Sequence, residues 1–341
     1  MTRAFRMAIV GCGRIASSHL QAIVASPLTE LAALVDPTVD RAQALAARYG
    51  VAPKTTASVE DLLSQVDGVV IATPNDTHAD LAVTCLKAGV STLIEKPLAA
   101  SVNEGERICR AAEDAGVALA VGYVTRFRDN VRLVARLLRD GTFGNVRRFA
   151  YQYGSRGGWA PLSGYNLDRA ASGGGVLVVT GTHFLDRMLD WFGYPSRMRL
   201  ADDAEGGPEA NAIATFVFDT DRGSIRGHAR FSKSVALEAG LVVETENGVL
   251  ILRDRPDAPV TFRPHHDSSV EQLFVPRAAV GGGTEFMRQL EDFVESARTG
   301  RTPLVSGRQS LESLRLIEDL YRHRVPLALA AATDIVPVES R

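Results

Sequence analysis

Residues 6–36 read RMAIVGCGRIASSHLQAIVASPLTELAALVD, and this stretch decides the fold of the N-terminal part of the chain. Two short apolar runs, residues 6–10 and 31–35, have the composition of buried strands. A glycine-rich turn follows the first run, and residues 15–25 then show helical spacing. A strand, a turn, a helix and a second strand in this order predict a βαβ unit with parallel strands.

The same alternation continues to about residue 125. Three further short apolar runs are separated by stretches of helical period, and they lie at residues 68–72, 91–94 and 118–121. Strands that alternate with helices favour a parallel sheet with helices on both faces. We therefore predict an α/β domain over residues 1–124.

The pattern changes in the rest of the chain. Longer runs alternate polar and apolar residues, as in an antiparallel sheet with one packed and one open face. These runs are residues 146–154, 212–220, 223–232, 240–254 and 260–265. Asn247 and Gly248 stand between two such runs and predict a hairpin.

Helical spacing recurs at about residues 175–191, 285–299 and 307–322. Together with the strand pattern, these helices predict an α+β domain with a large, mainly antiparallel open sheet over residues 125–325. Residues 326–341 are expected to form a C-terminal extension.

Composition excludes several classes of protein. The chain has 341 residues, enough for two domains of moderate size. Its 38 Lys and Arg against 40 Asp and Glu give a net charge of −2, so we expect neither nucleic acid nor a membrane surface as a partner. The cysteines, Cys12, Cys85 and Cys109, are odd in number and widely spaced. We therefore expect no disulfide framework, no metal site and a cytoplasmic location.

Gly11, Gly13 and Ala16 form the pattern G-x-G-x-x-A between the first predicted strand and helix. The first glycine permits a tight turn, the second lets a pyrophosphate approach the helix N-terminus, and the alanine allows close helix–strand packing. Asp36 lies 20 residues after Ala16, where a carboxylate accepts hydrogen bonds from the adenosine ribose. A 2′-phosphate would be repelled there, so the sequence predicts NAD rather than NADP, although Arg41 would weaken this preference. The alternative is an ordinary strand–turn–helix in which Asp36 caps the second helix.

The segment ATPNDTH, residues 72–78, follows a predicted strand at the carboxyl edge of the sheet. Ligands bind at that edge in open α/β sheets. Pro74, Asn75 and Asp76 favour a turn, from which Asn75 or His78 would reach the cofactor. For His78, an exposed position at a helix N-terminus is an equal alternative.

The motifs GCGRIA, ATPNDTH, EKPLA (residues 95–99) and SGGG…GTHFLD (residues 172–186) occur in this order. With them, residues 5–325 resemble the glucose–fructose oxidoreductase / inositol dehydrogenase / MocA (Gfo/Idh/MocA) family. The resemblance implies an N-terminal NAD-binding Rossmann domain and a second domain whose open sheet forms a homodimer or homotetramer. It also implies an NAD(P)-dependent dehydrogenase or reductase that acts on a CH–OH group of a small polyol, sugar, aminosugar or cyclitol.

Lys96 and His183 are the predicted catalytic residues. Lys96 follows a strand, and Pro97 fixes φ after it, which holds the lysine at the carboxyl edge. Near a nicotinamide cation, such a lysine suits proton transfer.

The family pattern places an aspartate four residues before the histidine, but this chain has Val179 there. Thr180, Tyr165, Asp168 or Asp186 would have to replace that aspartate, or Lys96 and His183 would share the proton transfer. A solvated surface lysine and a packed core histidine are the alternatives.

The remaining predicted site residues fall into two groups. The predicted cofactor residues are Gly11, Gly13, Arg14, Ile15, Asp36, Thr73, Pro74, Asn75, His78, Glu95 and Lys96. The connection over residues 153–175 is rich in glycine, aromatic and polar residues, as sugar-binding loops are. The predicted substrate residues are Arg126, Arg156, Trp159, Tyr165, Asn166, Thr180 and His183. For Arg126, a surface ion pair is an equal alternative.

Three functions fit this pattern. The first is hydride transfer between NAD and a secondary alcohol or ketone of a sugar, aminosugar or cyclitol. The second uses the same site for transient oxidation, with no net redox change. The third is a non-catalytic dinucleotide-sensing protein, which Val179 in place of the aspartate would favour.

Overall fold

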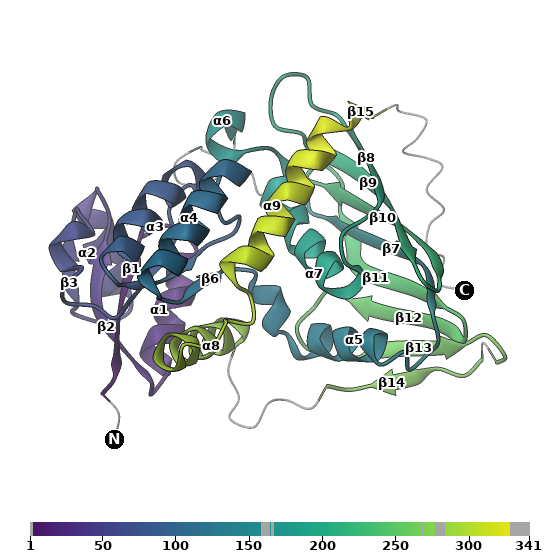
Figure 1. Cartoon of the computed structure of the whole chain (residues 1–341), viewed down its shortest axis with the longest axis horizontal. Coiled ribbons are helices and arrows are strands. Elements are labelled where there is room, and N and C mark those ends of the chain that lie inside the picture. The colour runs from purple at the N-terminus through teal and green to yellow at the C-terminus, as the bar shows by residue number, and fades with distance from the viewer. Residues whose placement is uncertain (1–2, 158–163, 165–166, 268, 277–283, 328–341) are drawn as a thin grey trace. The chain divides into compact units, whose positions relative to one another are not determined.

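The computed structural model describes residues 3–157, 164, 167–267, 269–276 and 284–327. The chain forms two compact units (Figure 1). Unit 1 comprises Met1–Arg132, Ala170–Gly173 and Arg277–Arg315, and unit 2 comprises Leu133–Arg169, Gly174–Pro276 and Leu316–Arg341. Within the described residues, no helix combines the length and the hydropathy that a membrane span requires.

Unit 1 contains a six-stranded sheet in the order β3-β2-β1-β4-β5-β6. Every neighbouring pair is parallel, which confirms the predicted Rossmann architecture. The strands are β1 (Phe5–Val10), β2 (Thr29–Val35), β3 (Lys54–Thr56), β4 (Gly68–Ile71), β5 (Ser91–Ile94) and β6 (Leu119–Val121). The helices between them are α1 (Ala16–Ala25), α2 (Val39–Arg48), α3 (His78–Lys87) and α4 (Val102–Ala115), with short turns η1 (Glu60–Leu62) and η2 (Asn75–Thr77). The sequence pattern did not predict β3.

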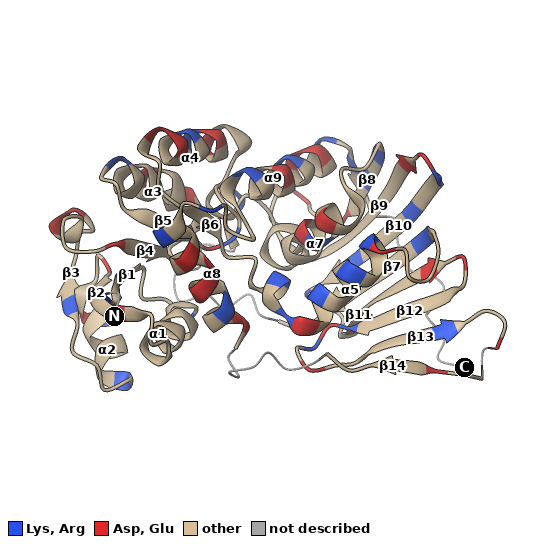
Figure 2. Cartoon of the chain, turned by 60° about the horizontal axis from the view of Figure 1, so that its bottom comes forward, with Lys and Arg blue, Asp and Glu red and all other residues tan. Residues whose placement is uncertain are grey.

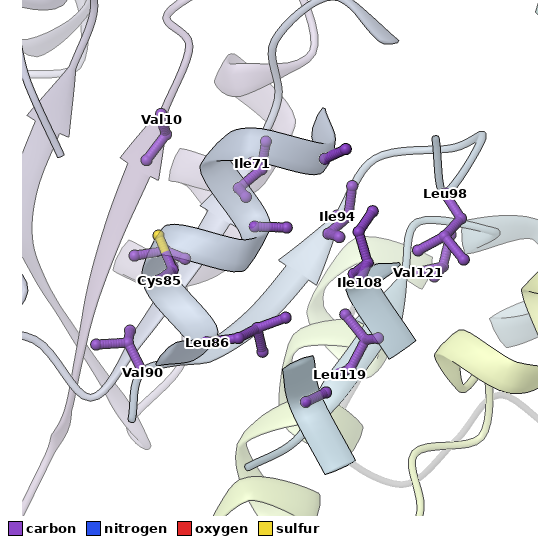
Figure 3. Close-up of a cluster of buried hydrophobic side chains, with 14 of the residues drawn as sticks. Val10, Ile71, Cys85, Leu86, Val90, Ile94, Leu98, Ile108, Leu119 and Val121 are labelled. Carbon is purple, nitrogen blue, oxygen red and sulfur yellow. The ribbon is translucent and has the colours of Figure 1, made fainter. Parts of the chain in front are cut away.

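Alternate residues of the strands supply the two cores of unit 1, because successive side chains of a strand point to opposite faces. Val10 of β1 packs with Ile71, Ile94 and Ile108 in the core under α3 and α4 (Figure 3). Met7 and Ile9 pack on the other face with α1. Burial on both faces explains why these strands are continuous apolar runs in the sequence.

Helix α8 (Glu285–Thr299) also belongs to unit 1, although it follows the second sheet in the sequence. Its Leu290, Phe293 and Val294 are buried in the core that contains Met7 and Ile9. The continuous ranges 1–124 and 125–325 remain a prediction of the domain boundaries. The compact units themselves are discontinuous, because α8 buries its apolar face against the first sheet.

Unit 2 contains a nine-stranded sheet in the order β14-β13-β12-β11-β7-β10-β9-β8-β15. The pairs β10–β7 and β15–β8 are parallel and the others antiparallel, so the predicted mainly antiparallel sheet is confirmed. The strands are β7 (Val146–Gly154), β8 (Arg197–Asp202), β9 (Asn211–Thr220), β10 (Gly223–Ser232), β11 (Leu237–Thr245), β12 (Gly248–Arg253), β13 (Val260–Pro264), β14 (Gln272–Phe274) and β15 (Arg324–Pro326). The sequence pattern did not predict β8 or the three-residue strands β14 and β15, and β15 includes the first residue of the predicted extension.

The other helical elements of the described residues are η3 (Val124–Phe127), α5 (Asp129–Arg139), α6 (Arg169–Ser172), η5 (Leu177–Gly181), α7 (Thr182–Phe192) and α9 (Gly307–Arg322). The sequence pattern missed α5. Phe184 of α7 stacks on Tyr151 of β7, with ring centroids 3.9 Å apart, so α7 packs on the inner face of the sheet. Helix α9 divides between the units, its first residues in unit 1 and Leu316 onward in unit 2.

The predicted hairpin forms between β11 and β12, but its glycine has a different role. Gly248 does not have a positive φ, so it is not the left-handed residue of an Asn-Gly turn. A Cβ at Gly248 would overlap the backbone carbonyl oxygen of Arg263 on β13. The glycine is therefore required for close approach of the neighbouring strand.

Candidate functional site

The turns after β1, β2, β4 and β5 lie at one edge of the sheet in unit 1, because these neighbouring strands are parallel. Gly11 has φ +94°, and a Cβ there would lie 2.6 Å from the carbonyl oxygen of Ala72. Only glycine fits this position. Among the described residues, apart from Gly13 and its chain neighbours, no atom lies within 4 Å of where a Cβ of Gly13 would be, so the backbone at the start of α1 is open on that side. Both features fit the approach of a pyrophosphate.

Asp36 is buried at the end of β2, and its carboxylate joins this turn to the next helix. Oδ2 accepts a hydrogen bond from the N–H of Cys12 at 3.0 Å, and Oδ1 accepts one from the N–H of Thr38 at 2.9 Å. The N-cap of α2 is Thr38 rather than Asp36, so the alternative in which Asp36 caps the second helix is wrong. Each carboxylate oxygen has capacity for a second hydrogen bond, so Asp36 fits a ribose diol.

The turn after β4 is held by side chains that point into the protein. Asn75 is buried, and its Nδ2 donates to the carbonyl oxygen of Ser172 at 2.9 Å. His78 is also buried, with Nδ1 3.0 Å from the carbonyl oxygen of Pro97 and Nε2 3.0 Å from that of Thr73. Burial lowers the pKa of His78, although these carbonyl oxygens favour the charged ring. An exposed position for His78 is therefore wrong; its imidazole connects the turn after β4 with that after β5.

The turn after β5 contains Glu95, Lys96 and a cis peptide bond before Pro97. Glu95 is buried, and its Oε1 lies 2.7 Å from Nε2 of His19 on α1. Its Oε2 accepts a hydrogen bond from the N–H of Lys96 at 3.2 Å. Burial opposes ionisation, but the hydrogen bond and charge of His19 and the charge of Lys96 outweigh it and lower the pKa of Glu95. Glu95 is thus a carboxylate that lies against the backbone of the half-buried Lys96.

The sequence pattern did not predict a role for His19. The sequence feature that could have indicated it is a histidine beside Leu20, on a helix whose buried face is otherwise apolar. The close approach of Gly122 to Glu95 was also unforeseen: a Cβ on Gly122 would lie 3.0 Å from Cδ of Glu95.

Arg126 lies in η3, directly after β6, and is only 5% exposed. An exposed surface ion pair for Arg126 is therefore wrong. Residues next to it in the sequence contact Arg288 of α8. Arg288 donates to the carbonyl oxygen of Phe127 at 2.9 Å, and its guanidinium lies 2.9 Å from the carboxylate of Asp129. The η3 segment is thus fixed to the core of unit 1.

In unit 2, His183 lies on the helix predicted over residues 175–191. The helix is present, but residues Leu177–Gly181 form a π-helical turn before α7 begins at Thr182. Such turns are rare in proteins, and those that occur are often found at functional sites. Val179, Thr180 and His183 are half-buried, whereas residues 176–178 and 184–188 are buried. These three residues are therefore less buried than their immediate neighbours at the start of the helix, while Asp186 is buried.

One turn after His183, a buried ion pair fixes α7 to the sheet. Nη2 of Arg187 lies 2.7 Å from Oδ2 of Asp254, and the hydroxyl of Tyr151 donates to the same oxygen at 2.5 Å. Nε of Arg187 donates to the carbonyl oxygen of His183 at 3.3 Å. Burial opposes the charge of Arg187, but Asp254 and Tyr151 raise its pKa, so it stays ionised. The sequence pattern did not predict this pair, because Arg187 and Asp254 are far apart in the chain.

The other predicted residues have these positions. Arg14 is exposed, and Ile15 is the half-buried N-cap of α1. Thr73 and Pro74 are half-buried beside Asn75, and Arg156 and Asp168 are exposed. Trp159, Tyr165 and Asn166 lie outside the described residues.

Comparison with known proteins gives two matches to one family. Residues 5–123 match the Gfo/Idh/MocA "Oxidoreductase family, NAD-binding Rossmann fold", and residues 135–324 match the "Oxidoreductase family, C-terminal alpha/beta domain".

Individual relatives cover nearly the whole chain. The rhizopine catabolism protein MocA of Rhizobium meliloti is 28% identical over 329 residues, which cover 93% of this chain and 94% of that protein. D-Glucoside 3-dehydrogenase of Escherichia coli is 29% identical over 341 residues, covering 93% of this chain and 94% of the relative. The crystal structure of aldose–aldose oxidoreductase from Caulobacter crescentus, complexed with glycerol, has a TM-score of 0.82 and 26% identity. That similarity covers 94% of this chain and 97% of the other.

Proposed function

The chain belongs to the Gfo/Idh/MocA oxidoreductase family, and we propose that it transfers hydride between NAD and a secondary alcohol or ketone of a sugar, aminosugar or cyclitol. The observation that carries the proposal is the group of turns after β1, β2, β4 and β5 in unit 1, which side-chain contacts of Asp36 and His78 connect. There the glycine turn, Asp36 and the Glu95–Lys96 turn lie at one sheet edge. The relatives named for a D-glucoside and for aldoses support a sugar-like substrate.

NAD supplies the hydride acceptor when it is bound. Gly11 and Gly13 would hold its pyrophosphate at the start of α1, and Asp36 would accept hydrogen bonds from its ribose. Asn75 and His78 contribute by holding the turn after β4, since their polar atoms contact backbone carbonyl oxygens. We assign these two residues an indirect role in cofactor binding.

Lys96 is proposed to exchange a proton with the substrate hydroxyl. Glu95 accepts from the N–H of Lys96 and itself contacts His19, so these two contacts hold the turn that carries the ammonium group. His183 is proposed to share this proton transfer, with Thr180, also half-buried, three residues before it in the helical segment. Arg126 and Arg156 are proposed substrate contacts.

We also propose that the enzyme is a cytoplasmic homodimer or homotetramer that associates through the outer face of the sheet in unit 2. A hollow of about 680 Å³ on this sheet is lined by Ala150, Val217, Val242 and Val249, with Arg148 and Arg226 among its polar residues. Figure 2 shows Lys and Arg residues on several strands of the sheet in unit 2. The cysteines Cys12, Cys85 and Cys109 are free and buried, which suits a reducing compartment.

The direct test is incubation of the purified protein with NAD or NADP and a panel of cyclitols, sugars and aminosugars. Formation of NADH with one class of polyol supports the proposal and identifies the substrate class. Turnover of a substrate without net NADH would instead favour transient oxidation. Tight NAD binding without any turnover would favour the non-catalytic alternative.

The preference for NAD is expected to depend on Asp36. Asp36→Ser removes the charge that repels a 2′-phosphate, and it leaves the N–H groups of Cys12 and Thr38 with weaker acceptors. We expect NAD to bind about tenfold more weakly, equivalent to about 1.4 kcal/mol, while NADP binding is unchanged or stronger. Calorimetric titration of both cofactors measures this ratio. Asp40→Ser, on the exposed start of α2, is the control, and an unchanged NAD/NADP ratio in Asp36→Ser would contradict the assignment.

A further inference from the structure

Three consecutive N–H groups at the start of the helix that carries His183 donate to one residue, Glu209. Those of Gly175 and Leu177 donate to its carboxylate at 2.9 and 3.0 Å, and that of Val176 donates to its backbone carbonyl oxygen at 2.8 Å. The first N–H groups of a helix have no partner within the helix. Glu209 supplies those partners from a distant part of the sequence, and its side chain is completely buried (0% exposed).

Tyr321, near the end of α9, completes this arrangement. Its hydroxyl donates to Oε1 of Glu209 at 2.7 Å and accepts from the N–H of Gly175 at 3.3 Å. The guanidinium of Arg169 lies 4.9 Å from the centre of its ring. Burial and the nearby Glu209 carboxylate raise the pKa of Tyr321 well above its usual value, so the hydroxyl remains a donor.

The glycine run before the helix is explained by this packing. A Cβ on Gly174 would overlap the hydroxyl of Tyr321, and a Cβ on Gly175 would overlap the backbone of Glu209. Neither glycine has a positive φ, so close approach rather than backbone conformation requires them. Glu209 lies two residues before β9, so the sheet fixes its position.

We propose that Glu209, together with Tyr321, is a positioning residue for His183: it fixes the start of the π-helical turn and thereby the location of the imidazole. The inference rests on the proton-transfer role proposed above for His183. A π-helical turn is a rare conformation, so its register needs a fixed starting point. Arg187 holds the same helix one turn after the histidine, and Glu209 therefore provides the second fixed point.

The test uses Glu209→Gln, which keeps the shape but turns an amide NH₂ toward an N–H of Gly175 or Leu177. A displacement of about 1 Å in a reacting group costs about 100-fold in rate, so we expect kcat to fall about 10- to 100-fold. The Kd and KM for NAD are expected to be unchanged, since the cofactor turns belong to unit 1. Tyr321→Phe is expected to show a smaller loss of kcat.

The control variants are Glu205→Gln and Tyr194→Phe. Glu205 is exposed in the same loop as Glu209, and the hydroxyl of Tyr194 donates to Asp319 on α9 at 2.8 Å. Both variants are expected to keep wild-type kcat. Loss of kcat in either one equal to that in Glu209→Gln would overturn the specific role of Glu209.

A double-mutant cycle separates positioning from general structural damage. If Glu209 acts through His183, Glu209→Gln should cause no further loss of kcat in a His183→Ala background. The same loss in both backgrounds, or full kcat in Glu209→Gln alone, would overturn the inference.

Amide hydrogen exchange of residues 175–183 provides a readout that needs no substrate. We expect exchange at Gly175, Val176 and Leu177 to be at least about tenfold faster in Glu209→Gln, because their acceptors are weakened. If the wild-type protein oxidises none of the polyols, the proposed function fails, and this measurement still decides whether Glu209 holds the helix. Unchanged exchange would overturn the inference whatever the substrate.

Discussion

Lys96→Ala is expected to lower the rate of hydride transfer about 10²- to 10⁴-fold, the usual contribution of a positioned general acid or base. Lys96 follows β5 at the carboxyl edge of the sheet, in the turn that Glu95 and His19 hold in place. NAD binding should change little, because the glycine turn and Asp36 remain intact. Single-turnover NADH formation with the substrate identified by the panel measures the effect.

Lys87→Ala is the matched control, because this lysine is exposed at the end of α3. It should behave as the wild type in both NAD binding and turnover. If Lys96→Ala retained more than about a tenth of the wild-type rate, proton transfer would have to be reassigned to another group, with His183 the first to examine.

Arg187→Met is expected to destabilise unit 2 by about 3–5 kcal/mol, because it leaves the carboxylate of Asp254 buried without its counter-ion. Arg187 is 1% exposed at its side chain, and its guanidinium also lies near the rings of Tyr151, Phe184 and Trp191. Denaturant unfolding followed by the fluorescence of Trp191 in α7 and of Trp159 measures the loss, with wild-type NAD binding as evidence that unit 1 remains folded.

The partner and control variants make this prediction specific. Arg187→Met combined with Asp254→Asn removes both charges, so the pair should lose less stability than the sum of the single variants. Arg197→Met is the surface control, since this exposed arginine lies 3.9 Å from Asp219 and should cost less than about 1 kcal/mol. Additive losses at Arg187 and Asp254 would show that the buried pair is not a coupled unit.

Local sequence determined much of the fold. Continuous apolar runs such as residues 68–72 and 91–94 predicted the parallel strands, because such runs suit strands buried on both faces. Period-2 alternation predicted β7, β9 and β10, because one face of that sheet is open. Strands β3, β14 and β15 have three residues each, which are too few for periodicity to be visible.

The candidate cofactor turn was likewise predictable, because its chemistry is local: Gly11, Gly13 and Asp36 follow strand ends at a fixed spacing. The residues that hold the proposed catalytic groups were not predictable from local pattern. His19 meets Glu95 and Glu209 meets Gly175 only after strands and helices distant in the sequence have packed together.

The sequence by itself therefore determined the order of strands and helices, the two kinds of sheet and the motifs at the edge of the first, since these depend on side-chain period and turn chemistry within a few residues. Only the tertiary structure decided that α8 completes the first core, that Gly248 admits a neighbouring strand, and that buried carboxylates hold the turn of Lys96 and the helix of His183. The physical reason is that a buried polar group must find its partner across space, and the identity of that partner is set by packing rather than by position in the chain.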